Sequence, residues 1–200
     1  MTTPFRERHP GVELTILSLS SAEIDRPLKT FDLDAGLTYL DGDPLGQVRK
    51  LPLYEERYLV ITSLDIVDED REEITWAEVA ELPLCLLTRD MQNRRIVDGL
   101  FRRFGDAPSP RIETNSISTL LSHVRWGRCS SVVPQAWLQF FGIPDGTRML
   151  HIAGNGSASR IGLVWLDNDP EPLLTSALLE VARGLDLQPV LDSVISGESS

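Results

Sequence analysis

Three polar residues, Asn115, Ser116 and Ser118, stand at the start of a predicted helix. The first turn of a helix has backbone N–H groups without partners inside the helix, and serine or asparagine side chains accept hydrogen bonds from them. The same turn carries partial positive charge and can bind a small anion. Two interpretations follow from these residues. Simple capping is the commoner role, and part of a small-molecule site is the alternative.

The spacing of apolar residues around this helix predicts a strand–helix–strand unit. Residues 111–114 form a short extended run, residues 115–126 carry apolar side chains at helical spacing, and residues 129–133 are extended again. In open sheets built from such units, ligands lie beyond the carboxyl ends of the strands. The polar helix start therefore falls at the edge of the sheet where ligands bind.

Motifs typical of catalysis or of bound cofactors are absent from the sequence. None of the histidines has a second histidine or a cysteine at metal-ligand spacing. No G-x-S-x-G elbow, P-loop or dinucleotide fingerprint occurs. Asp32, Asp34 and Asp90 could act as acids, but no partner stands near them in the sequence. We therefore expect no enzyme activity, no metal and no cofactor.

Two glycine-containing segments are interpreted as turns. Asp41 and Asp43 resemble the first ligands of a calcium loop, but the fifth position is Leu45 and no glutamate closes the loop. The segment "GNGSAS", residues 154–159, lacks the third glycine of a phosphate-binding loop.

The two cysteines, Cys85 and Cys129, are flanked by apolar residues in predicted strands. This context favours reduced, buried thiols over a disulfide, with a redox switch as the less favoured alternative. The N-terminus has no apolar signal region, and no apolar run approaches the roughly 18 residues of a membrane span. These features predict a cytoplasmic protein.

The chain of 200 residues is 42% hydrophobic and 24% charged, as is usual for a globular protein. Its 19 basic and 30 acidic residues give a net charge of −11. Such a charge repels nucleic-acid phosphates unless basic residues cluster. The pairs Arg94–Arg95 and Arg102–Arg103 look like the solvated face of one helix, so we expect the chain by itself to bind DNA poorly.

Strands and helices alternate along the predicted chain. We expect helices over 3–9, 21–31, 75–82, 91–104, 115–126 and 170–185, and strands over 12–16, 34–40, 84–88, 111–114, 129–133 and 159–166. Thr75 and Glu78 form a predicted capping box. The order indicates an α/β fold with a parallel or mixed sheet covered on both faces.

The ordered set of segments is more specific than any one motif. It comprises "FRERHPGVELTI", "DLDAGLTYL", "LPLYEERYLVIT", "ELPLCLLT" and "ETNSISTLLSHVRWGRCSSVVP". In order and spacing the set resembles the effector-binding domain of LysR-type transcriptional regulators over nearly the whole chain. The resemblance implies two Rossmann-like α/β subdomains of the type II periplasmic-binding-protein kind, with a ligand cleft between them. Subdomain I would comprise residues 1–62 plus 167–200, and subdomain II residues 63–166.

The resemblance also implies that parts of such a regulator are missing here. Family members begin with a winged helix-turn-helix and a linker helix, and their effector domain opens with a strand that precedes the helix at 3–9. We therefore expect DNA contact only through a missing N-terminal domain. We also expect the neighbours of the absent strand, 12–16 and 34–40, to be left unpaired, which would lower solubility and melting temperature until upstream residues are restored.

The resemblance places candidate ligand residues in both subdomains. They are Thr88, Arg89, Asn115 and Ser116 in subdomain II, and Ser18, Ser20 and Ser21 in subdomain I. Thr88 corresponds to a family hydroxyl that faces the cleft, although a strand-end threonine can also bond its own backbone.

The function implied is that of the co-inducer-binding and oligomerisation domain of a regulator, with a small organic anion as effector and a homodimer or tetramer as the assembly. Ile96, Val97, Leu100 and Phe101 could supply the dimer interface or could all pack inside. A stand-alone cytoplasmic solute-binding-like module is the main alternative, and an enzyme of unknown class is the third.

Overall fold

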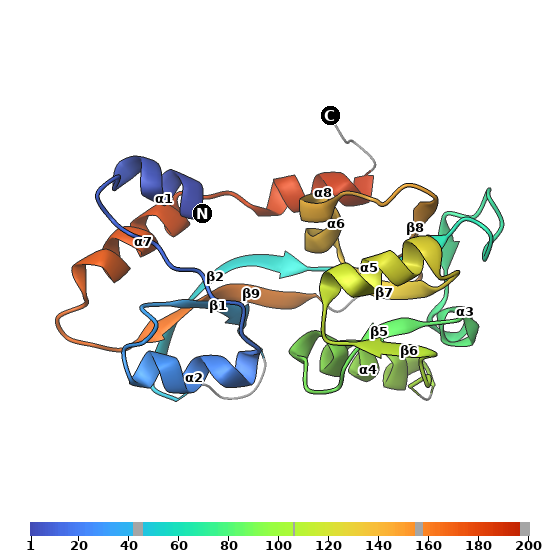
Figure 1. Cartoon of the computed structure of the whole chain (residues 1–200), viewed down its shortest axis with the longest axis horizontal. Coiled ribbons are helices and arrows are strands. Elements are labelled where there is room, and N and C mark those ends of the chain that lie inside the picture. The colour runs from blue at the N-terminus through green and yellow to red at the C-terminus, as the bar shows by residue number, and fades with distance from the viewer. Residues whose placement is uncertain (42–45, 106, 155–157, 197–200) are drawn as a thin grey trace. The chain divides into compact units, whose positions relative to one another are not determined.

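The computed structural model describes residues 1–41, 46–105, 107–154 and 158–196 (Figure 1). The chain divides into two compact units. Unit 1 comprises Met1–Glu55 and Ser159–Pro189, and unit 2 comprises Glu56–Ala158 and the residues from Val190 onwards. Residues 42–45, in the turn predicted around Asp41 and Asp43, and residues 155–157, in the turn predicted at 154–159, lie outside the described residues.

Unit 1 holds a three-stranded sheet with helices on both sides. Its elements are α1 (Thr2–Arg8), α2 (Ser21–Lys29), β1 (Gly36–Tyr39), β2 (Val48–Glu56), β9 (Ser159–Leu166) and α7 (Leu173–Arg183). The strand order is β1-β9-β2, and β1 is antiparallel to β9. Figure 1 shows α2 on one side of these strands and α7 on the other. Leu28 of α2 packs with Val164, and Leu179 of α7 packs with Trp165.

A glycine sets the spacing of β9 against its neighbour in this sheet. A Cβ atom on Gly162 would lie 2.2 Å from the backbone oxygen of Leu51 in β2. Any other residue at this position would push the two strands apart.

The predicted strand at residues 12–16 does not form. In the described part of the chain, residues 13–19 make no backbone hydrogen bond, and β1 has a strand partner only on the β9 side. Ile16 is 71% exposed and Leu17 is 57% exposed. Alternating side chains favour a strand, but a strand persists only when its N–H and C=O groups have a ladder partner. This prediction was wrong, because residues 13–19 have no such partner among the residues that the structure describes.

Unit 2 holds a mixed sheet. Its strands are β3 (Tyr58–Ser63), β4 (Glu73–Ile74), β5 (Cys85–Leu87), β6 (Ile112–Thr114), β7 (Ser130–Pro134) and β8 (Thr147–Ile152). The strands β4-β8-β3-β7 lie in that order, with β3 antiparallel to both neighbours. The parallel pair β5-β6 joins this sheet through a parallel bridge between Leu84, just before β5, and Ser130, the first residue of β7.

Helices cover both faces of this sheet, as the sequence predicted. They are α3 (Trp76–Glu81), α4 (Gln92–Phe104), α5 (Ile117–Trp126), α6 (Gln135–Phe141) and α8 (Gln188–Ser196). Residues of α3 and α4 enter one hydrophobic cluster, and residues of α5, α6 and α8 enter the other. The helices α6 and α8 and the strands β4 and β8 were not predicted from the sequence.

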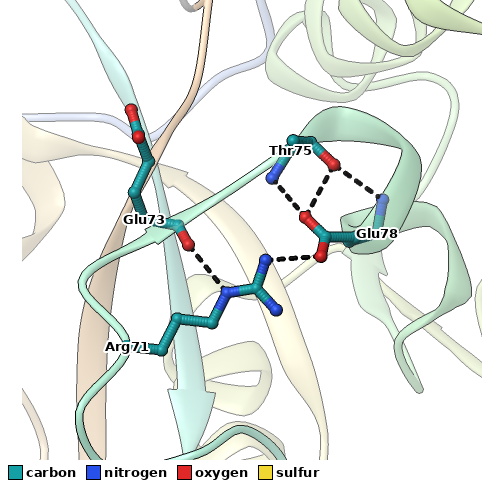
Figure 2. Close-up of polar contacts among 4 residues, drawn as sticks. All are labelled: Arg71, Glu73, Thr75 and Glu78. Carbon is teal, nitrogen blue, oxygen red and sulfur yellow. Dashed lines mark hydrogen bonds and ion pairs between the residues drawn. The ribbon is translucent and has the colours of Figure 1, made fainter.

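The predicted capping box begins α3 (Figure 2). The Glu78 N–H donates to the Thr75 Oγ1 at 3.3 Å, and the Thr75 N–H donates to a Glu78 carboxylate oxygen at 2.9 Å. Arg71 extends the motif, since its guanidinium pairs with Glu78 and its Nε donates to the Glu73 carbonyl at 2.8 Å. Hydrogen bonds from Arg71 and from Thr75 lower the pKa of Glu78 to about 2.

The borders of the two units differ from those implied by the family resemblance. They fall after Glu55 and after Ala158, whereas borders after residues 62 and 166 were expected. The difference arises because β3 hydrogen-bonds to β7 and β8 in unit 2, while β9 hydrogen-bonds to β1 in unit 1. The C-terminal segment also divides, because Val194 of α8 is buried in a core of unit 2.

Candidate functional site

Four of the predicted ligand residues follow the ends of two paired strands in unit 2. Because β5 and β6 are parallel and adjacent, their carboxyl ends lie at the same edge. Thr88 and Arg89 follow β5, while Asn115 and Ser116 follow β6. The Thr88 N–H donates to the Thr114 carbonyl at 3.0 Å and so ties the two strand ends together. We call this group of four residues the β5–β6 edge.

Two helices begin at the β5–β6 edge. They are α4 and α5, which pack into the cores on opposite faces of the sheet. The first turn of α4 has no side-chain cap, because Met91 occupies the N-cap position. Both helix starts add partial positive charge to the edge.

The polar side chains of the β5–β6 edge differ in their partners. The Thr88 hydroxyl is buried and has no hydrogen-bond partner among the described residues, so the self-bonding interpretation does not hold. Arg89 and Asn115 are exposed, and neither forms an ion pair or a hydrogen bond with any residue the structure describes. The Ser116 Oγ accepts from the Thr119 N–H at 3.3 Å, which confirms capping for that residue.

A buried arginine, Arg94, contacts the two strands whose ends form the β5–β6 edge. The Arg94 side chain is 1% exposed, which contradicts the prediction that it belongs to a solvated face. Its Nε donates to the Asp98 Oδ1 at 2.7 Å, and its Nη1 donates to the Leu87 carbonyl at 2.6 Å and to the Glu113 carboxylate. The sequence signal that was missed is the i, i+4 spacing of Arg94 and Asp98, which permits an ion pair along the helix.

The serines predicted as ligands in unit 1 surround the start of α2. Ser20 is the N-cap, and its N–H donates to a Glu23 carboxylate oxygen at 2.8 Å. The Ser21 Oγ accepts from the Thr38 hydroxyl of β1 at 2.9 Å. Ser18 is exposed and has no partner within the described ranges. These three serines belong to unit 1, whereas the β5–β6 edge belongs to unit 2.

Two cavities in unit 1 lie beside the extended residues 12–17 rather than beside these serines. The larger, about 660 Å³, is bounded by α1 and residues 12–16. The second, about 330 Å³, is bounded by residues 12–17, by residues 32–35 and by α7. Both cavities are therefore lined in part by residues 12–16, which were predicted to form a strand.

The cysteines are buried, reduced thiols, as predicted. Cys85 and Cys129 belong to the same core of unit 2. Burial, with a smaller contribution from Cys129, raises the pKa of Cys85 to about 11. A protonated thiol is a poor nucleophile, so this environment does not favour the redox-switch alternative.

Comparison with known proteins identifies the family. Residues 2–185 match the LysR substrate binding domain. The chain belongs to this family. The LysR resemblance noted in the sequence is thereby confirmed, and so is the α/β fold of the periplasmic-binding-protein kind. Proteins of this family are transcriptional regulators that bind effectors.

Individual LysR-type relatives agree with this assignment. The chain is 27% identical to a probable nitrogen assimilation transcriptional activator of Synechococcus elongatus over 138 residues, which are 67% of the chain and 44% of that protein. It superimposes on an OxyR mutant of Corynebacterium glutamicum with a TM-score of 0.81 at 20% identity, covering 100% of the chain and 62% of the solved protein. The CcmR regulatory domain of Synechocystis in complex with 2-PG also gives 0.81, at 17% identity, covering 92% and 88%.

The LysR-type chain thus spans less than half the length of the curated relative and about three fifths of the OxyR structure. No described helix is long and apolar enough to cross a membrane. No group of three or more histidine, cysteine, aspartate or glutamate side chains in the described ranges is placed to hold a metal ion.

Proposed function

We propose that this LysR substrate-binding domain binds a small organic anion at the β5–β6 edge through Thr88, Arg89, Asn115 and Ser116. The observation that carries the proposal is the buried Thr88 hydroxyl without a partner, next to an arginine that has none either. A carboxylate accepts from both a hydroxyl and a guanidinium, and the starts of α4 and α5 favour the same negative charge.

The wider function follows from the family. Effector binding in the complete regulator shifts the populations of two conformations of this domain. That shift repositions the attached DNA-binding domains. The domain is then a ligand sensor in the cytoplasm and not an enzyme, because the free energy of effector binding is enough to shift the two conformations and no chemical step is needed. Ser18, Ser20 and Ser21 of unit 1 form a second predicted set of ligand residues, to be tested separately.

Calorimetric titration tests the site. The 200-residue chain and the complete regulator are titrated with acetate, pyruvate and malonate, and the anion that binds most tightly is kept as the probe. Arg89→Gln should weaken binding of that probe by about tenfold or more, the loss expected for one charge-assisted hydrogen bond. Arg102→Gln is the matched control, since Arg102 is also exposed but lies in the last turn of α4.

The two variants separate the possible outcomes of this titration. An equal, small loss of affinity in both would indicate a general charge effect and remove Arg89 from the site. Full affinity in Arg89→Gln, together with full affinity in Thr88→Val, would place the effector elsewhere in the domain.

A further inference from the structure

Arg94 is the only lysine or arginine that is buried among the residues the structure describes. It contacts three elements: Asp98 on its own helix α4, the Leu87 carbonyl at the end of β5, and Glu113 in β6. A planar guanidinium presents its donors in a fixed fork, so partners bonded to it take fixed relative positions.

The partners of Arg94 stand next to the residues that form the β5–β6 edge. Leu87 immediately precedes Thr88, and Glu113 stands two residues before Asn115. Burial lowers the pKa of Arg94, but the hydrogen bonds to Asp98 and Glu113 outweigh this effect and raise it. The guanidinium therefore keeps its positive charge.

We infer that Arg94 is the positioning residue of the effector site, and this inference rests on the proposed function for the identity of that site. It touches no ligand. By holding the end of β5 and the end of β6 to the same guanidinium, it sets the spacing of Thr88 and Arg89 relative to Asn115 and Ser116. A purely structural ion pair would instead stabilise α4 without affecting the geometry of the edge.

The two carboxylates bonded to Arg94 allow these roles to be separated. Asp98 lies four residues along the same helix, so its bond to Arg94 joins no two elements. Glu113 lies in β6, so its bond joins α4 to the edge. The Glu113 side chain is 44% exposed, and Glu113→Gln therefore disturbs the core little. Asp98→Asn is its matched partner, because each variant replaces one carboxylate by an amide of the same shape.

Hydrogen exchange of the Thr88 amide measures the geometry of the edge directly, because this N–H donates to Thr114 across the two strand ends. Glu113→Gln and Arg94→Lys should speed its exchange by about ten- to hundredfold, the range for losing a hydrogen bond to a charged group. Asp98→Asn should lower the melting temperature while leaving this amide protected. Equal exchange at Thr88 in Glu113→Gln and the unchanged chain would overturn the inference. If Arg94→Lys fails to fold, the exchange rate of the Thr88 amide in Glu113→Gln alone tests the inference.

Calorimetric affinity for the probe anion, measured alongside Thr88 exchange, distinguishes the positioning role of Arg94 from the proposed anion site. Faster Thr88 exchange in Glu113→Gln, together with weaker probe binding there than in Asp98→Asn, supports both. Faster exchange with no anion bound by the unchanged chain supports the positioning of the edge and removes the proposed ligand class. Normal exchange and normal affinity in both Glu113→Gln and Arg94→Lys removes the positioning role and leaves the site proposal in place.

Discussion

A buried hydroxyl that has no partner destabilises a folded protein, because in the unfolded chain water satisfies it. For a neutral group the cost is about 1–3 kcal/mol. Thr88 meets this description among the described residues, and it stands beside Arg89, which also lacks a partner. Such a cost at one site is typical of residues kept for binding rather than for stability.

We expect Thr88→Val to raise the free energy of unfolding by about 1 kcal/mol while weakening anion binding, because valine has the same shape and removes the unpaired hydroxyl. Urea unfolding measures the first effect and calorimetry the second. Thr119→Val serves as a control, since Thr119 is exposed and its side chain lies outside the four residues of the β5–β6 edge. A loss of stability in Thr88→Val would mean that its hydroxyl is paired in solution.

At the scale of an element, the start of α3 shows how a local motif is strengthened by one residue outside it. Arg71 and the capping box hold Glu78 from both sides, and Trp76 and Val79 of the helix then reach the core of unit 2. The lowered pKa of Glu78 makes this arrangement sensitive to acid.

The pH dependence of stability should show the contribution of Glu78. Its pKa is about 2 in the folded protein and close to the usual value of 4.5 in the unfolded chain, so its stabilising contribution is complete above about pH 4.5 and is lost as the pH falls towards 2. Glu78→Gln should therefore be less stable than the unchanged chain at pH 6 and similar to it near pH 2. Urea midpoints measured across this range check the expectation. A constant difference at all pH values would contradict it.

The extended residues 13–19 illustrate an element that lacks its neighbour. Ile16 and Leu17 are exposed, and the backbone has no ladder partner in the described part of the chain. Unpaired apolar edges of this kind promote association between chains. We expect Ile16→Lys with Leu17→Lys to reduce aggregation of the 200-residue chain, measured by light scattering during heating. Replacing the exposed Phe140 and Phe141 of α6 by lysine is the control for a general gain in solubility.

At the scale of the whole molecule, we expect the 200-residue chain alone to be poorly soluble or to melt at a low temperature. Burying one large apolar side chain contributes roughly 1.5 to 3 kcal/mol, and Ile16, Leu17 and Leu19 are exposed instead of buried, so the chain lacks a substantial part of a typical stability of about 5 to 15 kcal/mol. Calorimetry at several scan rates measures the melt. A cooperative transition above about 60 °C, with anion binding intact, would contradict this expectation and favour a stand-alone binding module.

The oligomeric state is a separate prediction. The sequence left open whether the apolar residues of α4 form a dimer interface or pack inside. In the structure Val97, Leu100 and Phe101 are buried and Ile96 packs against the same core. Packing inside therefore accounts for all four. We still propose a homodimer or tetramer on the basis of the family, through surfaces other than this one. Light scattering at tens of micromolar that shows only a 22.3 kDa species would count against it.

Features that depend on residues close together in the chain were predicted correctly from the sequence. The capping box of Thr75 and Glu78 formed as expected. The strand predicted at 84–88 and the helix predicted at 115–126 also formed, over Cys85–Leu87 and Ile117–Trp126. Their determinants act over one helical turn or along one strand, where side-chain type and spacing decide the local structure. The same local reasoning placed the four residues of the β5–β6 edge at the carboxyl ends of two strands.

Features that depend on which strands pair were decided only by the tertiary structure. Residues 12–16 alternate like a strand, yet they have no strand partner among the described residues. The partner of β1 is instead β9, which lies more than a hundred residues away in the chain. Arg94 looked exposed by its neighbours in sequence, but the folding of β6 beside β5 buries it against Glu113. Pairing and burial depend on contacts between distant segments, and no local pattern encodes where those segments meet.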